Sequence, residues 1–228
     1  MVIDNGLSAW EANAEFWDNF MGDESNGFHR NLVRPNVEKL LEATENDVVL
    51  DIACGNGNFS ERLAGFGARV IAFDYSAKMI ELAKKRRKSV LDKVEFHVCD
   101  AADSAALLRL IGNKPFDKAV ANMAIMDIAE IEPLFKALST MLKDGGAFVC
   151  ATHHPCFTFP NDDYFTNCID KGEAVEGQPV LHNYYHRTIS DIFNIAFKNG
   201  FIVDGCYEVP FSGEKKPIIM VIRFRKNS

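Results

Sequence analysis

Residues 51–60 combine a carboxylate with two closely spaced glycines. Gly55 and Gly57 follow an apolar run typical of a buried strand, and a helical pattern begins directly after them. Such glycines let the backbone approach a ligand closely, and the N-terminus of the following helix can bind an anionic group. Asp51 ends the strand, and Ser60 replaces the third glycine of the dinucleotide fingerprint. Because Asp51 would repel a pyrophosphate but attract an ammonium or sulfonium group, the segment favours a cationic nucleotide over NAD.

Two further carboxylates and an amide follow the next apolar runs. Asp74 ends the second run, where an acidic residue can accept both hydroxyls of a ribose. Asp100 ends the third run and is placed to accept a hydrogen bond from an exocyclic amine, and Asn122 ends the fourth. A single acidic residue after a strand is usually a helix cap or a turn former. Three of them after successive strands, together with the glycine loop, predict a nucleotide site.

The elements that must position these residues alternate between two patterns. Short runs of branched and aromatic residues predict strands at 47–52, 69–73, 94–99, 118–122, 147–152, 201–208 and 218–224. Apolar residues at three- and four-residue spacing predict helices at 58–66, 77–90, 105–111 and 131–142. This alternation predicts an α/β fold with right-handed crossovers and a mostly parallel sheet covered by helices on both faces.

Two regions depart from this alternation. Residues 7–44 predict two helices around a loop at 22–27, and the simplest role of their aromatic residues is to cover the sheet edge. Residues 152–183 show no clear periodicity, and so long an irregular stretch is usually a lid or a binding loop. We therefore expect one domain with an N-terminal helical lid (1–44), a cofactor-binding core (45–152), a substrate loop or insertion (153–186) and a closing helix with strands (187–228).

The motifs Asp51-x-x-Cys54-Gly55-x-Gly57, Asp74 and Asp100-Ala101 resemble those of the class I S-adenosylmethionine-dependent methyltransferases. The resemblance implies a Rossmann-like, seven-stranded, doubly wound sheet with the last strand antiparallel. It also implies that the glycines and the Ala53 backbone hold the methionine moiety, Asp74 the ribose and Asp100 with Ala101 the adenine, while the main chain of Asn122 closes the site and Trp17 or Arg30 reaches in from the lid. The predicted cofactor-binding residues are Asp51, Ala53, Gly55, Gly57, Asp74, Tyr75, Asp100, Ala101, Asn122 and Arg30.

Histidines near the fifth strand are candidates for proton transfer. In-line attack on a sulfonium methyl group needs no metal, but a hydroxyl, thiol or protonated amine acceptor must lose a proton, and histidine suits that task near neutral pH. His153 and His154 directly follow the fifth strand and are the predicted catalytic residues, while His182 and His186 are further candidates; a structural role is open for each. Cysteines and histidines of this region could bind zinc, but beyond the isolated His182/His186 pair their spacing matches no zinc motif, so no metal is predicted.

Charge and motif content bear on the acceptor. The formal net charge of −7 argues against a large nucleic-acid surface, and the fourth strand lacks the Asn/Asp-Pro-Pro-Tyr/Phe motif typical of enzymes that methylate exocyclic base amines. A small-molecule acceptor is therefore favoured, with O, N, S or C as the methylated atom. A tRNA-modifying methyltransferase is the first alternative, with the basic run 84–88 as an RNA contact, although a solvated helix face is the simpler interpretation of that run. A nicotinamide-dependent reductase and a cofactor-binding module without turnover are the alternatives from other classes.

The composition also argues against several other classes of protein. The chain has 228 residues, of which 47% are hydrophobic and 11% aromatic, which is too rich a composition for disorder. Its longest apolar stretch, 119–126, falls far short of the roughly 18 residues of a membrane span, and the N-terminus does not read as a secretory signal. None of the six cysteines forms a C-x-x-C pair, so a disulfide scaffold is not expected. We expect a cytoplasmic protein without a membrane partner; the oligomeric state is left open.

Overall fold

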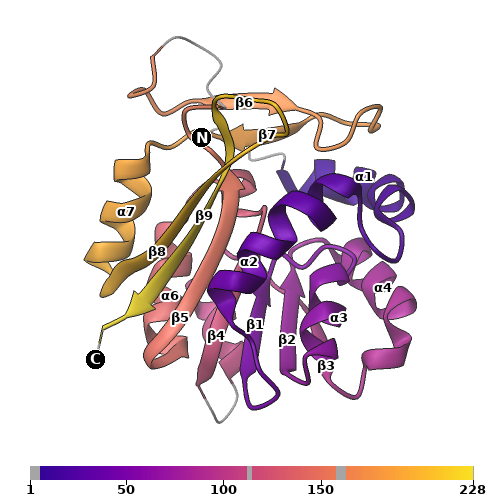
Figure 1. The fold of residues 1–228 in the computed structure, drawn as a ribbon. Helices are drawn as coiled ribbons and strands as arrows, with labels where there is room; N and C mark the ends of the chain where they lie inside the picture. The colour runs from indigo at the N-terminus through magenta and orange to yellow at the C-terminus, as the bar shows by residue number, and fades with distance from the viewer. Residues whose placement is uncertain (1–5, 112–114, 158–162, 228) are drawn as a thin grey trace.

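A mixed seven-stranded sheet forms the centre of the computed structural model, which describes residues 6–111, 115–157 and 163–227. The strand order is β3-β2-β1-β4-β5-β9-β8 (Figure 1). β1 to β5 are mutually parallel, and β9 runs antiparallel to both β5 and β8. The strands are β1 (Val48–Ile52), β2 (Arg69–Asp74), β3 (Val94–Val98), β4 (Phe116–Asn122), β5 (Leu142–His153), β8 (Phe201–Pro210) and β9 (Pro217–Lys226). The predicted fold class and the antiparallel last strand are confirmed.

Helices cover both faces of the sheet. α5 (Ser104–Leu108), α6 (Glu132–Met141) and α7 (Ile189–Lys198) pack on one face, and α2 (Arg34–Leu41), α3 (Asn58–Gly65) and α4 (Ala77–Arg86) pack on the other (Figure 1). Side chains of a strand alternate between its two sides, so Leu50 of β1 joins the first core cluster and Val49 the second. Both residues are fully buried, as expected for a central strand with apolar residues on each side.

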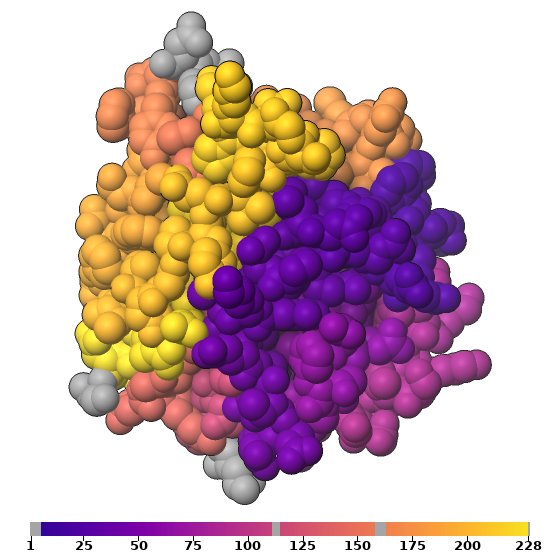
Figure 2. All heavy atoms as spheres, in the orientation of Figure 1, coloured from indigo at the N-terminus to yellow at the C-terminus, as the bar shows by residue number. Residues whose placement is uncertain are grey.

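An N-terminal segment, residues 6–33, precedes α2. It contains α1 (Gly6–Met21) and a short π-helical turn, η1 (His29–Val33). On the face shown in Figure 2, α2 rather than this segment lies against the last two strands, and Arg223 of β9 donates a hydrogen bond to the main-chain oxygen of Leu40 at 3.1 Å. The predicted pair of N-terminal helices is therefore present as α1 and α2, with residues 1–5 outside the described part of the chain.

The region expected to lack periodic structure contains a second sheet. β6 (Ile169–Gly172) pairs antiparallel with β7 (His182–Tyr185), and the two strands lie across the carboxyl ends of the main sheet in Figure 1. Their sequences, Ile-Asp-Lys-Gly and His-Asn-Tyr-Tyr, lack apolar alternation because this sheet packs above the site rather than on the main core. The expectation of an irregular stretch at 152–183 is therefore wrong for residues 169–172, 182 and 183, and residues 158–162 of it lie outside the described part.

Two helices end earlier than their apolar pattern predicts. α4 ends at Arg86 and is followed by a 3₁₀ turn, η2 (Lys88–Val90), and α5 gives way to η3 (Arg109–Ile111). Among the described residues, no helix has the length and apolar character needed to cross a bilayer.

Candidate active site

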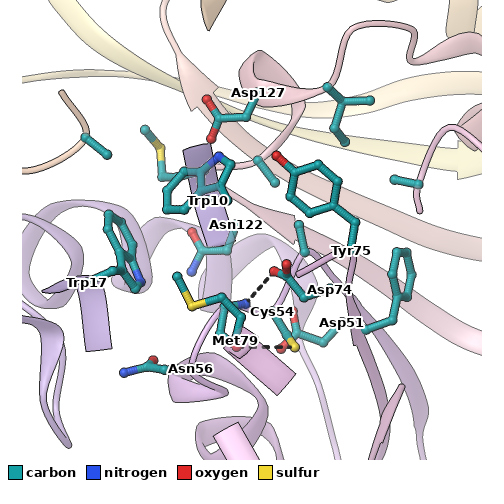
Figure 3. A pocket seen from close by; sticks show the side chains of 18 of the residues that line it. Trp10, Trp17, Asp51, Cys54, Asn56, Asp74, Tyr75, Met79, Asn122 and Asp127 are labelled. Atoms are coloured by element: carbon teal, nitrogen blue, oxygen red, sulfur yellow. Dashed lines mark hydrogen bonds between the residues drawn. The ribbon is translucent and has the colours of Figure 1, made fainter. Parts of the chain in front are cut away.

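A pocket of about 860 Å³ opens at the carboxyl ends of β1, β2 and β4. In open α/β sheets ligands bind in the crevice outside these strand ends, and the volume lies within the range typical of small-molecule sites. Figure 3 shows residues of the strand ends and of the N-terminal segment around this space. The predicted residues that line it are Asp51, Ala53, Gly55, Asp74, Tyr75, Asp100, Ala101, Asn122, His153 and Trp17.

The glycine loop after β1 has a tightly turned backbone. Ala53, Gly55 and Gly57 all have positive φ angles, of 52°, 53° and 73°. A Cβ atom on Gly57 would lie only 2.8 Å from Cζ of Phe96, so this position needs glycine for both space and conformation. Gly57 does not itself line the pocket; it shapes the loop that brings Gly55 and Asn56 there.

Asp74 is tied to that loop. Its Oδ2 accepts a hydrogen bond from the main-chain N–H of Gly55 at 3.0 Å, and its Oδ1 accepts one from the N–H of Ser76 at 2.9 Å. Burial raises the pKa of Asp74 to about 6, against the effect of these hydrogen bonds. Since each carboxylate oxygen has two acceptor sites, Asp74 keeps acceptor capacity for a hydroxyl group in the pocket.

Asp51 is almost fully buried, with 1% of its surface exposed. The Ser60 hydroxyl donates a hydrogen bond to Asp51 Oδ2 at 2.5 Å, which explains a serine at the place of the third fingerprint glycine. Burial raises the pKa of Asp51 to about 7, and the nearby Asp74 raises it further. Because the described residues give Asp51 no cationic partner, a positively charged ligand group would stabilise its ionised form.

Asp100, Ala101 and Asn122 border the same pocket. Asp100 is exposed, and its Oδ1 accepts a hydrogen bond from the N–H of Ala102 at 2.8 Å. Asn122 Oδ1 is buried and has no hydrogen-bond partner within the described part of the chain. A buried polar atom is normally paired, so the Asn122 amide is available to a ligand.

Of the two adjacent histidines, only His153 lines the pocket. Its Nδ1 is buried without a hydrogen-bond partner among the described residues, and burial lowers its pKa to about 4, so the ring is neutral at pH 7. His154 instead faces away: its Nε2 lies 2.8 Å from Glu208 Oε1, and its Nδ1 accepts the N–H of Cys156 at 3.1 Å. This placement gives His154 a structural contact and no access to the pocket.

Arg30 also stays outside the pocket. Its exposed side chain forms an ion pair with Glu24 at 3.4 Å. Trp17 does reach in, and its indole Nε1 lies 3.5 Å from the point that a Cβ on Gly55 would occupy. Tyr184, one of the aromatic residues that the sequence offers as a pocket wall, lines the pocket as well. Trp10 and His29 also line it and were not predicted, because nothing in the local pattern places them near the strand ends.

Asp127 was missed as well, although it lies in η4 (Ile125–Asp127), only a few residues beyond Asn122. Its position shortly after the fourth strand was the available signal. Burial raises its pKa well above the ordinary value, and Asp74 adds to this effect. The fourth strand end therefore also carries a carboxyl group.

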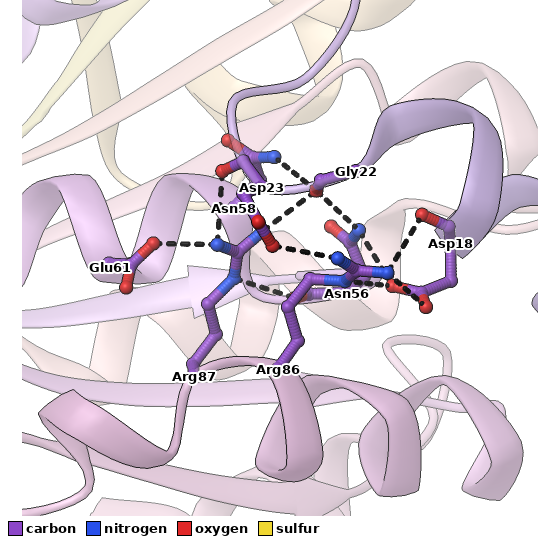
Figure 4. A network of polar contacts seen from close by, with 8 residues as sticks. All are labelled: Asp18, Gly22, Asp23, Asn56, Asn58, Glu61, Arg86 and Arg87. Carbon is purple, nitrogen blue, oxygen red and sulfur yellow. Dashed lines mark hydrogen bonds and ion pairs between the residues drawn. The ribbon is translucent and has the colours of Figure 1, made fainter.

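Two arginines hold the N-terminal segment over the pocket (Figure 4). Arg86 contacts Asp18 Oδ1 at 2.6 Å and Asp23 Oδ1 at 2.7 Å. Arg87 is 1% exposed and donates to the main-chain oxygens of Gly22 and Asp23 at 3.2 and 3.0 Å, as well as to Glu61 at 2.6 Å. The interpretation of residues 84–88 as a solvated face is therefore wrong at Arg87, because tertiary contacts bury this side chain.

The described residues do not place three or more His, Cys, Asp or Glu side chains together as a metal would require. All six cysteines are free. The arrangement consists of a nucleotide-sized pocket with acidic strand ends.

The sheet order, the glycine loop and the acidic strand ends together define a class I S-adenosylmethionine-dependent methyltransferase. The protein belongs to this family: residues 43–189 match the family model described as a methyltransferase domain. The family uses S-adenosylmethionine as its methyl donor, so the match favours this cofactor over the nicotinamide of the reductase alternative.

Curated relatives include two ubiquinone biosynthesis O-methyltransferases. The one from Pelagibacter ubique is 30% identical over 147 residues, which are 63% of this chain and 58% of that protein. The one from Brucella ovis is 37% identical over 120 residues, 52% of this chain and 44% of that protein. The match thus spans about half the length of these relatives.

Solved structures share the fold. An S-adenosylmethionine-dependent methyltransferase from Listeria monocytogenes, described as putative, superposes with a TM-score of 0.71 at 24% identity, covering 85% of this chain and 97% of that one. Magnesium protoporphyrin IX methyltransferase from Synechocystis PCC 6803, with bound S-adenosylhomocysteine, superposes with a TM-score of 0.63 at 17% identity, covering 96% of each chain.

The residues of the pocket fit this cofactor. Within the described part of the chain, Asp51 has no cationic partner, Asp74 keeps acceptor capacity, and Asn122 Oδ1 has no hydrogen-bond partner. A ligand with an ammonium or sulfonium group, two ribose hydroxyls and an adenine would supply the missing cationic partner and hydrogen-bond partners of these residues.

Proposed function

We propose that the protein transfers the methyl group of S-adenosylmethionine to a nucleophilic atom of a small-molecule acceptor, with His153 as proton acceptor. One observation carries the small-molecule assignment: the pocket is closed over by α1 and the β6–β7 region. Asn13 of α1 donates to the main-chain oxygen of Val180 at 2.7 Å and accepts the N–H of Val180 at 3.0 Å. Asn13 is 1% exposed, so this pair of hydrogen bonds is buried and protected from water.

We assign the cofactor contacts from the sequence motifs and the pocket geometry. Asp74 would bind the ribose hydroxyls, and Asp100 with the N–H of Ala101 the adenine. Asp51 and the backbone at Ala53 and Gly55 would hold the methionine end. Tyr75 and Asn122 line the same space and would complete the contacts.

The chemistry divides between donor and protein. When bound, S-adenosylmethionine supplies an electrophilic methyl group on a positively charged sulfur. The protein orients the acceptor against that methyl group and excludes water, which is where most of the rate acceleration of such a transfer arises. His153 is neutral, and its Nδ1 has no hydrogen-bond partner among the residues that the structure describes, so it would take the proton that the acceptor releases.

We assign a separate role to each of the four parts of the chain. Residues 1–44 would serve as a lid, 45–152 as the cofactor-binding core, 153–186 as the substrate region and 187–228 as the closing helix and strands. The close contact of α1 with Val180 supports a shared role for the first and third parts above the pocket.

The tRNA alternative is less well supported than the sequence suggested. Arg86 and Arg87 contact the N-terminal segment, so Lys84, Lys85 and Lys88 are the exposed charges left in the basic run. Three exposed lysines on an acidic protein provide little attraction for a phosphate backbone.

The test is incubation with S-adenosylmethionine labelled in its methyl group and with separated metabolite and RNA fractions from a cell extract. We expect label in a low-molecular-mass fraction. Transfer of label to RNA instead would contradict the proposal. A parallel reaction with His153→Gln should give much weaker labelling of the same fraction, while binding of S-adenosylhomocysteine is unchanged.

A further inference from the structure

Buried polar atoms at one end of the pocket lack hydrogen-bond partners. They belong to Asn122 (Oδ1), Asp127 (Oδ1), His153 (Nδ1) and His182 (Nε2), as far as the structure describes the chain. The first three residues line the pocket, and the His182 ring packs behind it. Since buried polar atoms are nearly always paired in native proteins, the unpaired atoms of Asn122, Asp127 and His153 on the pocket wall indicate that a polar ligand completes them.

The surroundings of His182 decide which of its nitrogens carries the proton. Gln178 Oε1 accepts the main-chain N–H of Ala174 and of Val175, at 2.9 and 3.3 Å. The amide nitrogen of Gln178 therefore donates to His182 Nδ1, at 3.0 Å. Nδ1 is thus an acceptor, and the proton of the neutral ring is on Nε2, which lies 3.6 Å from Asp127 Oδ1.

His182 consequently orients Asp127 instead of acting as a base. Burial lowers the pKa of His182 to about 4, so the ring is neutral at pH 7 and directs an N–H toward the carboxyl group. Among the described residues, no arginine or lysine lies within ion-pair distance of Asp127. Burial and the nearby Asp74 raise the pKa of Asp127, so a hydrogen-bond donor or a cation from a ligand is needed to stabilise its ionised form.

Aromatic rings pack against the His182 ring that faces this carboxyl group. The His182 ring lies 4.9 Å from that of Trp10 and 4.5 Å from that of Tyr184, and both of those side chains line the pocket. In Figure 3, Asp127 lies beyond Trp10 and Asn122 as seen from Asp74. A carboxylate next to the faces of aromatic rings is a favourable environment for a cationic or N–H-bearing group.

Building on the proposed function, we propose that Asp127, oriented by His182, binds the methyl acceptor, and that the acceptor is a small aromatic amine whose N–H group donates to Asp127. In its ionised form the Asp127 carboxylate accepts hydrogen bonds only, and an N–H or ammonium donor would stabilise that form against the burial and the Asp74 charge that raise its pKa. An amine supplies such a donor, whereas a carbonyl or ether oxygen does not.

Methyl transfer to that nitrogen balances with the groups already named. The lone pair of the nitrogen forms the N–C bond, and the C–S bond breaks. The electron pair of the C–S bond stays on sulfur. The released N–H proton passes to His153 Nδ1. Asp127 and His182 hold the nitrogen in place and undergo no covalent change.

Matched pairs of aromatic amines and alcohols test this inference. Benzylamine with benzyl alcohol, and 2-phenylethylamine with 2-phenylethanol, are titrated calorimetrically into protein saturated with S-adenosylhomocysteine. We expect each amine to bind about tenfold or more tightly than its alcohol, the range of a hydrogen bond to a charged group. Asp127→Asn should remove this preference without changing the affinity for S-adenosylhomocysteine, and His182→Phe should weaken it.

Glu130→Gln is the matched control, because this exposed acidic residue is close in sequence but does not line the pocket. It should keep the amine preference. Equal binding of alcohols, absence of amine binding, or a preserved preference in Asp127→Asn would overturn the inference. If Asp127→Asn fails to bind S-adenosylhomocysteine, the inference is judged from the unaltered protein alone. It then stands if the amines bind more tightly than the alcohols and falls if they do not.

The proposed function is tested separately. If a small molecule without an N–H group gains the labelled methyl, the role of Asp127 is wrong while the small-molecule assignment stands. If RNA gains the label, the proposed function itself is wrong.

Discussion

The main-chain N–H of Gly55 donates a hydrogen bond to Asp74 Oδ2 at 3.0 Å. This contact joins the glycine loop after β1 to the end of β2, so that the two motifs of the cofactor site form one unit. Gly55 has a φ of 53°, a conformation that glycine adopts without strain. The loop can thus present its backbone to a ligand while Asp74 stays oriented.

Asp74→Asn should lower the affinity for S-adenosylmethionine by about tenfold to a hundredfold, because an amide cannot replace a carboxylate that accepts from two hydroxyls and two main-chain N–H groups. Isothermal titration measures the change. Asp103→Asn is the control, since Asp103 caps α5 and does not line the pocket. Unchanged affinity in Asp74→Asn would show that the ribose lies elsewhere.

Asp51→Asn should alter how stability depends on pH. Burial raises the pKa of Asp51 from an ordinary 3.8 to about 7, so the free protein holds the protonated form more favourably than the unfolded chain does. The stabilisation of the fold by protonated Asp51 is fully present below pH 4 and is lost as the pH rises through about 7. Between pH 5 and 8 the unaltered protein should therefore lose more thermal stability than the variant, as measured by calorimetry without cofactor. Parallel curves for the two proteins would show that Asp51 does not titrate in this range.

His153→Gln and His154→Gln should separate catalysis from stability. Loss of the pocket histidine should reduce kcat by about a hundredfold or more when the acceptor must lose a proton, with little change in Tm. Loss of His154 should lower Tm, because its buried ring joins Glu208 to the Cys156 N–H, and should leave kcat nearly intact. The reverse pattern would show that the proton acceptor is His154 and not His153.

Arg87→Met should destabilise the fold by about 3 kcal/mol or more, because main-chain oxygens of Gly22 and Asp23 would lose their buried donor. Urea unfolding provides the measurement. The adjacent exposed Lys88→Met is the control and should stay within about 0.5 kcal/mol of the unaltered protein. Similar values for the two variants would mean that the N-terminal segment is held by other contacts.

The cofactor half of the site could be read from the sequence because its signals are local. Asp51 and Asp74 each end an apolar run, and the carboxyl ends of parallel strands meet at one edge of a sheet. Once the runs were recognised as strands, the meeting of these residues followed from the topology. The exposed Asp100 joined them for the same reason, at the end of β3.

The acceptor half could not be read in this way, because its contacts join distant parts of the chain. Asp127 faces His182 of β7, and Asn13 of α1 forms a hydrogen bond with Val180. No periodic pattern in the sequence predicts either contact. The polar strands β6 and β7 escaped detection because they pack above the pocket rather than on the main core.

By itself, the sequence therefore determined the α/β sheet, the glycine loop and the acidic strand ends, since these depend on local hydrophobic pattern and on turn chemistry. Only the tertiary structure decided that His153 faces the pocket while His154 does not, since residues next to each other at a strand end point to opposite sides. Tertiary packing likewise buried Arg87 in a basic run that the sequence alone would leave in solvent.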